Sequence, residues 1–321
     1  MLRNKVFFAL FLKIMALLAL LFASFWAIPQ AATKQLQNTY LASMVEKHHR
    51  LEALQSPRLV LVGGSSMAFG TDSQLLQDSL GIAIQNMATQ IVLGSRFMLN
   101  EVKSSLREGD RVVVGFEYHI SSEGDKEQQL LASDNYPNAL QYIDFENTTS
   151  KCVEIIKHQI SRFRFTIGAL LVTQAETEPA ITDTVSVFFR NGFNKQGDLL
   201  SHLNNPPQLP LQHAELPSNI DESAIVKDLT AFSLWATQHG IQVCYAFPPY
   251  SASAYQKNQE TIRRIEQEFR QIPNIHFIGT ATDYVFPDTL FFDSVYHLNQ
   301  AGRQQRTKKM LAWLKNQPFT H

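Results

Sequence analysis

The chain has 321 residues, of which 45 % are apolar, so it can fill a substantial core as one large or two modest domains. A chain that is disordered throughout is excluded. The formal net charge is -1, and Lys and Arg are scattered along the sequence, so the chain has no cluster of positive charge that would bind nucleic acid. We therefore expect no nucleic-acid partner.

The first predicted element is an apolar helix from Val6 to about Ile28. At about 1.5 Å of rise per residue, this helix can cross a hydrocarbon core of about 30 Å. Residues 1–29 are therefore predicted to be an uncleaved anchor. Arg3 and Lys5 precede the helix, and because positive charge stays on the cytoplasmic side, the remainder of the chain is predicted to lie outside the cytoplasm. A cleaved signal peptide is the alternative, because "AIPQAAT" has small residues suited to cleavage, although the apolar core of such a peptide spans only about 7 to 15 residues.

The next segment, "KQLQNTYLASMVEKHHRLEALQ", has helical spacing. Residues 30–57 are predicted to form a helical stalk that leads away from the membrane. His48 and His49 are expected on the solvated surface of this stalk rather than at a metal site.

From Arg58 onward, apolar runs typical of strands alternate with helical patterns. The predicted strands are residues 58–63, 82–88, 110–118, 241–250 and 275–279, and the predicted helices are residues 73–80, 95–107, 221–240, 255–271 and 300–317. Strands without polar alternation are buried on both faces, as in a parallel sheet flanked by helices. The predicted fold class is therefore α/β, with residues 58–321 as one domain.

The alternation is interrupted by an insertion at about residues 121–219. Helices are expected within residues 138–165, and loops rich in Asn and Pro, such as "SHLNNPPQLPLQ", follow them. A long insertion at the carboxyl end of a strand is where α/β enzymes build a lid or a binding wall. We interpret the insertion as substrate-facing, with a decorative insertion as the alternative.

The two cysteines, Cys152 and Cys244, lie far apart in the sequence. They are interpreted as buried free thiols, with a disulfide in an exported protein as the alternative. No CxxC or Cys/His metal spacing occurs, so neither a structural zinc site nor another cofactor is expected.

The stretch "LVGGSSMAFG" contains the first candidate for chemistry. Gly63 and Gly64 would let the chain turn sharply as it leaves the first strand, which places Ser65 at the carboxyl edge of the sheet and at the start of a helix. Backbone N–H groups there favour negative charge, so Ser65 is a candidate nucleophile whose own N–H would stabilise an oxyanion. Helix capping by serine is the alternative. A phosphate-binding P-loop is not indicated, because the glycine spacing differs and no Lys follows Gly70.

The second candidate lies in "DTLFFDSVYHLNQAGRQQRTKKML", before the last helix. A serine nucleophile needs a base to take its proton, and that base needs a carboxylate to fix its tautomer. Asp293 and His297 can supply these groups, with Asn299 as the helix cap. Because all strands of a parallel sheet share one carboxyl edge, Ser65, His297 and Asp293 are expected to converge as a catalytic triad.

The blocks "GGSSMAFG" and "FFDSVYHLNQAG" resemble the opening and closing blocks of the SGNH (GDSL-like) hydrolase superfamily. The chain more specifically resembles the membrane-anchored SGNH-like proteins that accompany membrane-bound O-acyltransferases in exopolysaccharide and cell-wall acylation. The stretches "QNMATQIVLGSRFML", "GDRVVVGFEY" and "FRNGFNKQGDLLSHL" add to this likeness. The resemblance implies a flavodoxin-like three-layer α/β/α domain with a parallel sheet, on the periplasmic side of a bacterial inner membrane. It also implies a membrane-bound O-acyltransferase partner and a polysaccharide substrate.

Carried over residue by residue, the resemblance implies that Ser65 is the nucleophile, His297 the general base and Asp293 its orienting partner. The backbone N–H of Ser65, with that of Gly94, would form the oxyanion hole. The sequence departs from the family in two places: the usual DxxH is DxxxH here, and "GFEY" replaces the GxND block with its Asn. Ser66 is an adjacent rival for the nucleophile.

Further residues near the expected site have structural and functional interpretations. Glu117, Tyr118 and His119 follow the third strand, and Asp288 precedes the Asp293 loop; structural roles are favoured for all four. Phe188, Phe189 and Phe193 beside Arg190 would form either a sugar platform or core packing.

The expected activity is transfer of an acyl group, by resemblance acetyl, through a serine ester to a polysaccharide. With water as the acceptor the same steps make an esterase. The alternative is a non-catalytic SGNH-like scaffold that binds a glycan or docks onto the acyltransferase.

Overall fold

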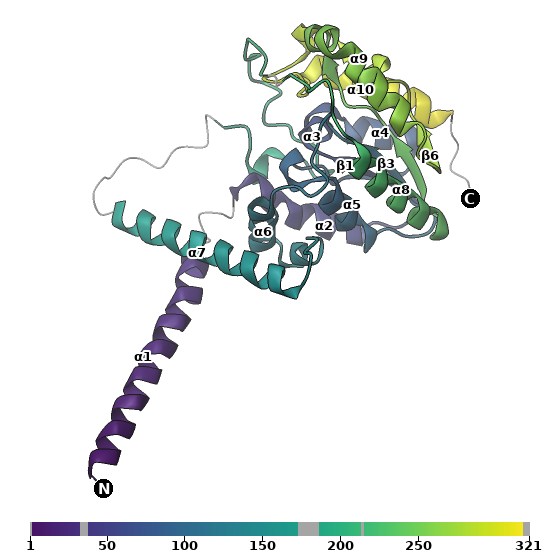
Figure 1. The fold of residues 1–321 in the computed structure, drawn as a ribbon. Coiled ribbons are helices and arrows are strands. Elements are labelled where there is room, and N and C mark those ends of the chain that lie inside the picture. The colour runs from purple at the N-terminus through teal and green to yellow at the C-terminus, as the bar shows by residue number, and fades with distance from the viewer. Residues whose placement is uncertain (1, 33–37, 173–185, 213–214, 317–321) are drawn as a thin grey trace. The chain divides into compact units, whose positions relative to one another are not determined.

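The computed structural model describes residues 2–32, 38–172, 186–212 and 215–316, and the chain divides into two compact units. The first unit comprises Met1–Asn38 and Phe145–Asp183, and the second comprises Thr39–Asp144 and Thr184–His321. Figure 1 shows both as a ribbon.

The first unit contains the long apolar helix α1, Leu2–Ala32. Residues Val6–Gln30 of this helix are 25 residues with a mean hydropathy of 2.7, and none of the most apolar stretch is buried. This helix is long and apolar enough to cross a membrane, as the sequence predicted, and it is consistent with a single-pass anchor.

Helix α7, Thr148–Val172, belongs to the same unit although it comes from the predicted insertion. It packs across the carboxyl-terminal part of α1 (Figure 1). The side chain of Gln159 donates to the carbonyl of Phe25 at 2.6 Å, and the rings of Phe25 and Phe163 lie 5.4 Å apart. The insertion is therefore divided between the two units.

The second unit is built on a five-stranded parallel sheet in the order β2-β1-β3-β4-β6. Its strands are β1 (Arg58–Gly63), β2 (Ala83–Asn86), β3 (Arg111–Gly115), β4 (Gln242–Tyr245) and β6 (Ile275–Phe277). Every residue of β1 and β3 is buried, as expected for strands covered on both faces. A separate two-stranded parallel pair joins β5 (Tyr250–Ser251) to β7 (Val285–Phe286). The α/β class is thus confirmed.

Helices cover both faces of the large sheet (Figure 1). Helix α5 (Ser95–Lys103) contacts β1 and α8 (Ser223–Gln238), which contacts β4. On the other side, α10 (Gln300–Lys315) packs on α3 (Ser65–Gly70) and α4 (Ser73–Leu80). Helix α9 (Ala252–Phe269) connects β5 with β6. Short 3-10 helices cover Ile91–Leu93, Pro137–Gln141, Arg190–Gly192, Thr282–Tyr284 and Asp288–Leu290.

From Thr39 onward, the segment predicted to be a helical stalk is instead part of the globular unit. Its 3-10 turn Tyr40–Ser43 is buried, and in helix α2 (Met44–Ala53) Lys47 and His48 are buried, whereas His49 is exposed. The Lys47 ammonium donates to the carbonyls of Asn86, Ala88 and Gly197, and burial lowers the pKa of Lys47 to about 7. The prediction for His48 was wrong because its ring bonds to buried Glu101 at 3.0 Å and stacks on Tyr136.

The remaining part of the insertion is held to the globular unit by polar contacts. It begins with helix α6, Lys126–Asn135, whose first turn is capped by Asp125. Farther on, fully buried Asp198 accepts hydrogen bonds from Ser73, Asn86 and Arg303. These contacts join a loop of the insertion to α4, to the end of β2 and to α10.

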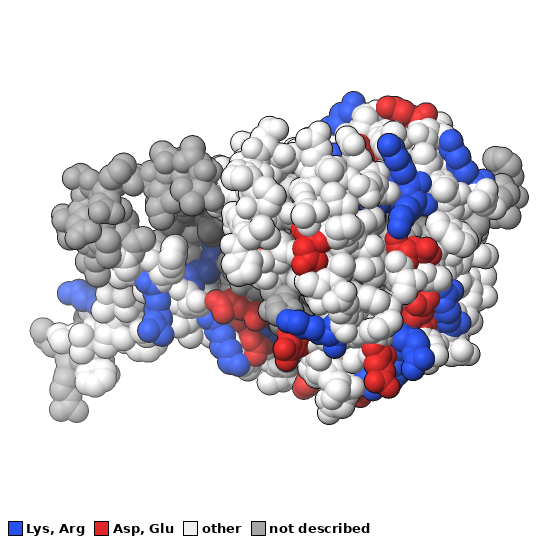
Figure 2. Space-filling model, turned by 90° about the horizontal axis from the view of Figure 1, so that it is seen from above, with Lys and Arg blue, Asp and Glu red and all other residues white. Residues whose placement is uncertain are grey.

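Two smaller features bear on the sequence predictions. Cys244 is buried in β4, as expected, whereas Cys152 on α7 is exposed, and the two do not form a disulfide. On the face seen in Figure 2, blue and red side chains of the globular unit are interspersed rather than gathered by sign.

Candidate active site

Ser65 lies at the carboxyl end of β1, where the sequence placed it. Strand β1 ends at Gly63, and α3 begins at Ser65 with Gly64 as its N-cap and no side-chain cap. Ser65 therefore does not serve as the helix cap, which was the alternative interpretation. Gly64 has an ordinary φ of -84°, so its turn needs no glycine. A Cβ there would lie 2.3 Å from a carboxylate oxygen of Glu117, so a side chain at this position would have to displace that carboxylate.

The three side chains predicted to form a triad make one continuous chain of hydrogen bonds. The Oγ of Ser65 lies 2.8 Å from Nε2 of His297, and Nδ1 of His297 lies 2.7 Å from Oδ1 of Asp293. The side chains of His297 and Asp293 are 12 % and 13 % exposed, so the arrangement is shielded but reachable from solvent.

The hydrogen-bond partners fix the state of the imidazole. A carboxylate can only accept, so Nδ1 of His297 carries the hydrogen that bonds to Asp293. Nε2 then has a free lone pair in the neutral ring and accepts the hydroxyl hydrogen of Ser65. This is the tautomer that a general base for a serine nucleophile requires.

The extra residue of the DxxxH spacing is accommodated by a closed loop. The N–H of Phe292 donates to the carbonyl of His297 at 2.8 Å, and Phe291 forms an antiparallel bridge with Leu298. Inside this loop the hydroxyl of Ser294 accepts from the N–H of His297. The loop therefore turns Asp293 back toward His297 although four positions separate them.

Aromatic packing holds the imidazole of His297 in place. Phe69, from α3, stacks on it with ring centroids 4.0 Å apart and planes 11° apart. Behind Phe69 lies the ring of His202, at 4.4 Å. His202 is 1 % exposed, its Nε2 donates to the carbonyl of Leu298 at 3.0 Å, and burial lowers the pKa of His202 to about 4. His202 is therefore neutral near pH 7 and fixes the backbone next to His297.

Glu117 is the residue of this site that the sequence analysis underestimated. Its side chain is 3 % exposed, and its Oε1 accepts from the N–H of Ser66 at 2.7 Å and lies 3.3 Å from the hydroxyl oxygen of Ser65. The pairing of Gly63 with Gly115 brings the residues two positions farther on, Ser65 and Glu117, to the same point of the sheet edge. The "GFEY" block thus places a carboxylate directly beside Ser65.

The neighbouring candidates have different environments. The hydroxyl of Ser66 is buried without a hydrogen-bond partner among the described residues, whereas Ser65 is half-buried beside a base, so Ser65 is the better nucleophile. The N–H of Ser65 has no acceptor within the described part of the chain, so this group is able to donate to an oxyanion. The N–H of Gly94 already donates to the carbonyl of Ile91 at 3.1 Å, so this conformation does not offer it as the second donor.

The aromatic residues of the insertion separate into two roles. Phe188 is 43 % exposed, and its ring lies 5.6 Å from Phe69 and 6.3 Å from His297. Phe193 instead packs on Tyr40, and Arg190 is paired with Glu46. Phe188 therefore borders the site, whereas Phe193 contributes to packing.

The other polar candidates have structural partners. Tyr118 packs edge-on against Tyr250, and the N–H of exposed His119 donates to Glu222. Asp288 accepts from the N–H of Ser253. Among the residues that the structure describes, no group of three or more His, Cys, Asp or Glu is arranged to hold a metal ion.

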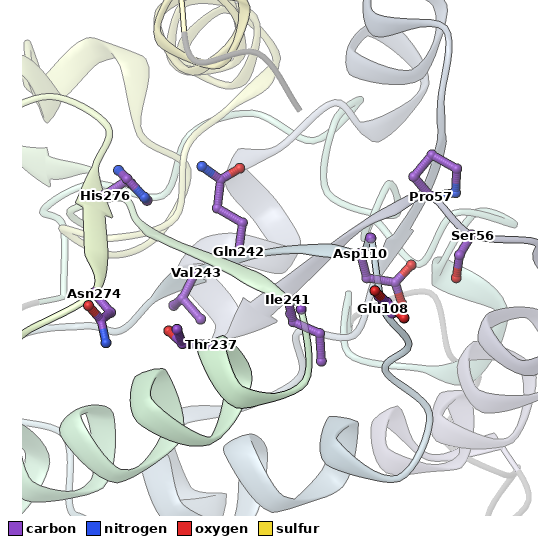
Figure 3. A pocket seen from close by; sticks show the side chains of 12 residues that line it. Ser56, Pro57, Glu108, Asp110, Thr237, Ile241, Gln242, Val243, Asn274 and His276 are labelled. Atoms are coloured by element: carbon purple, nitrogen blue, oxygen red, sulfur yellow. The ribbon is translucent and has the colours of Figure 1, made fainter. Parts of the chain in front are cut away.

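A cavity of about 680 Å³ lies at the opposite edge of the sheet, near the amino ends of β1, β3, β4 and β6. Figure 3 shows Gln242 and His276 on one side of it and Ser56, Pro57 and Asp110 on the other. The Asp110 carboxylate is already bonded to buried Arg58. This cavity contains none of the residues predicted to be catalytic.

A scan against models of protein families finds no match to this chain, and a search of curated proteins finds none either. The geometry of the site is therefore the basis of the functional argument.

Proposed function

We propose that the protein is a membrane-anchored, serine-dependent acyl-transfer enzyme of the SGNH type. One observation carries the proposal: the chain of hydrogen bonds from Ser65 through His297 to Asp293 at the carboxyl edge of the sheet. The strand order of the sheet supports it, because this is the order of flavodoxin-like doubly wound folds. Their ligands bind at the point where the strand order reverses, here between β1 and β3.

In the proposed reaction, Oγ of Ser65 attacks the carbonyl carbon of an acyl donor while Nε2 of His297 takes the hydroxyl proton. Asp293 stabilises the resulting imidazolium, and the N–H of Ser65 donates to the tetrahedral oxyanion. The oxyanion collapses, the bond to the leaving group breaks, and His297 returns the proton to that group. An acceptor hydroxyl then gives up its proton to His297 and attacks the serine ester. The bond between the acyl carbon and Oγ of Ser65 breaks, and His297 returns the proton to Oγ, which transfers the acyl group to the acceptor and regenerates Ser65.

The proposed acceptor is a sugar hydroxyl of an exported polysaccharide, and the proposed acyl group is acetyl. The resemblance of the end blocks to the membrane-anchored SGNH-like proteins supports this choice, as does exposed Phe188, whose ring could stack on a pyranose beside His297. The same resemblance supports a membrane-bound O-acyltransferase as the partner that supplies acyl groups. Helix α1 would hold the enzyme at the periplasmic face of the inner membrane, next to that partner.

The experiment is to incubate the full-length protein in detergent with p-nitrophenyl acetate and to measure the intact mass. We expect one acetyl group on Ser65, absent from Ser65→Ala and retained in Ser66→Ala. Adding xylo- or cello-oligosaccharides distinguishes the acceptors, because transfer yields an acetylated sugar whereas hydrolysis yields acetate alone. An unmodified wild-type protein that releases no nitrophenol would contradict the proposal.

A non-catalytic scaffold is the second candidate, and Glu117 is the observation that favours it. Its carboxylate occupies the place of the family's GxND amide and bonds to the N–H of Ser66, so this position supplies no neutral donor to an oxyanion. The test is to delete the gene for this protein and to reintroduce either the wild type or Ser65→Ala. If the protein is a scaffold, both versions restore acylation of the polysaccharide equally well. If it is an enzyme, only the version with Ser65 restores it.

A further inference from the structure

We infer that helix α7 is an interfacial helix, whose exposed apolar side lies on the lipid bilayer beside the outer end of α1. The insertion of the globular unit would thereby return to the membrane and give the chain a second attachment to it. The inference concerns the first unit alone and is independent of the chemistry of Ser65.

The first observation is an exposed apolar row along α7. Val153, Ile156 and Ile160 are 42 %, 51 % and 43 % exposed. Their spacing of three and four residues places them on one side of the helix. Three aliphatic side chains grouped on one side of a helix are costly to leave in water, which favours a covering surface.

The second observation is the place where α7 meets α1. The contacts involve Phe25 and Pro29 of α1, which bond to Gln159 and Arg162 of α7. From Val6, about 20 residues at about 1.5 Å each cross the roughly 30 Å of hydrocarbon and end near Trp26. Helix α7 therefore contacts α1 at the level where the hydrocarbon gives way to headgroups, and Trp26 is an aromatic residue of the kind enriched there.

The third observation is the charge of α7. The helix carries Lys151, Lys157, Arg162 and Arg164 against a single acidic residue, Glu154. Lys157 and Arg164 are exposed. An apolar row with basic neighbours is the pattern of helices that lie in a membrane surface containing anionic lipids.

The bilayer is the occupant that these observations favour over a protein. The apolar row lies on a helix that packs against α1, which is itself apolar enough to span the membrane, and a basic helix at headgroup level meets lipid phosphate without any additional partner. A helix of a membrane protein could also cover such a row, and the experiment below separates the two.

The test uses the full-length chain reconstituted into vesicles of phosphatidylethanolamine and phosphatidylglycerol. An environment-sensitive fluorophore is placed at Ile156→Cys in a Cys152→Ser background, with Ile160→Cys as a second site; Cys244 is buried and does not compete for the label. Glu154→Cys is the matched control, because it lies two residues away on a different side of the same helix. Leu17→Cys, within α1, reports whether the anchor has inserted.

We expect lipids spin-labelled near the headgroup to quench probes at 156 and 160 at least twofold more than the probe at 154, and aqueous iodide to show the opposite order. With the probe at Leu17 buried in lipid, equal iodide access at 154 and 156 would overturn the inference. Shielding at 156 that develops only when a membrane-protein partner is added would also overturn it and would assign the row to that partner.

Discussion

At the scale of single residues, the candidate site depends on which atoms accept and which donate. Ser65 has two acceptors within reach, Nε2 of His297 at 2.8 Å and Oε1 of Glu117 at 3.3 Å. The shorter contact favours His297, and Glu117 is the partner of the N–H of Ser66. Glu117 thus organises the turn that presents Ser65.

The Glu117 interaction leads to a prediction about stability. Glu117→Ala leaves the N–H of Ser66 buried without an acceptor, which costs about 1–3 kcal/mol of folding free energy. Glu117→Gln keeps an oxygen acceptor and is expected to lose much less. Urea unfolding of the two full-length variants in detergent, followed by tryptophan fluorescence, compares them. Equal losses in both variants would show that the charge of Glu117, and not its role as acceptor, matters for folding.

His202 leads to a prediction about pH. Burial lowers its pKa from 6.5 to about 4, so the unfolded chain binds a proton on this residue at a higher pH than the folded chain does. The contribution of His202 to the free energy of unfolding is fully present above pH 6.5. It decreases as the pH falls toward 4, by about 3 kcal/mol in total.

The variant His202→Gln does not titrate and can still donate to the carbonyl of Leu298. Its free energy of unfolding should therefore decrease less than that of the wild type between pH 7 and pH 4, when both are measured by urea titration. A decrease equal to that of the wild type would rule out His202 as the source.

The sequence predicted that Ser65, His297 and Asp293 converge, because motif chemistry and a shared sheet edge are both visible in it. Glu117 was assigned a structural role because its approach to Ser65 depends on strand register. The pairing of Gly63 with Gly115 becomes apparent only when "LVGGSS" and "VVGFEY" are aligned as neighbouring strands. The N–H of Gly94 was predicted to be the second oxyanion donor, but it is engaged locally with the carbonyl of Ile91, a contact that sequence motifs do not reveal.

At the scale of elements, the buried carboxylate of Asp198 joins the insertion to the sheet layers. Asp198→Ala would leave Ser73 and Asn86 without this buried acceptor, whereas Arg303 keeps Asp72, and we expect a loss of roughly 3–5 kcal/mol. Asp125→Ala is the control, because it removes an exposed helix cap and should cost only about 1 kcal/mol. Thermal unfolding of both variants tests the comparison, and similar losses would contradict the role given to Asp198.

The strands and main helices of the sheet were predictable because apolar runs and helical spacing repeat regularly; β1 and α4 have the predicted bounds. The stalk was not predictable in the same way. Lys47 and His48 are polar residues that sequence patterns assign to the surface, and only carbonyls and a carboxylate from distant segments make their burial favourable.

At the scale of the whole molecule, Arg3 and Lys5 predict the orientation of the chain. Alkaline phosphatase fused to the C-terminus should be active, because it folds only outside the cytoplasm, whereas a C-terminal green fluorescent protein should be dark. Arg3→Gln combined with Lys5→Gln should weaken this orientation. An inactive phosphatase fusion together with a fluorescent green fluorescent protein fusion, both on the wild-type chain, would contradict the predicted topology.

The division of the insertion could not be foreseen at this scale. The sequence indicates a helix near residues 148–172, but whether it joins the sheet domain or α1 depends on contacts such as that between Phe25 and Phe163. Residues 186–212 join the globular unit instead, through Asp198.

The central claim is that Ser65 is a nucleophile activated by His297, and covalent labelling of the folded full-length protein with a fluorophosphonate probe tests it most directly. The account predicts an adduct on Ser65 that is lost in Ser65→Ala, strongly reduced in His297→Ala and unchanged in Ser66→Ala. Absence of label from the wild type, an adduct on Ser66, or labelling of Ser65 that is indifferent to His297 would contradict it.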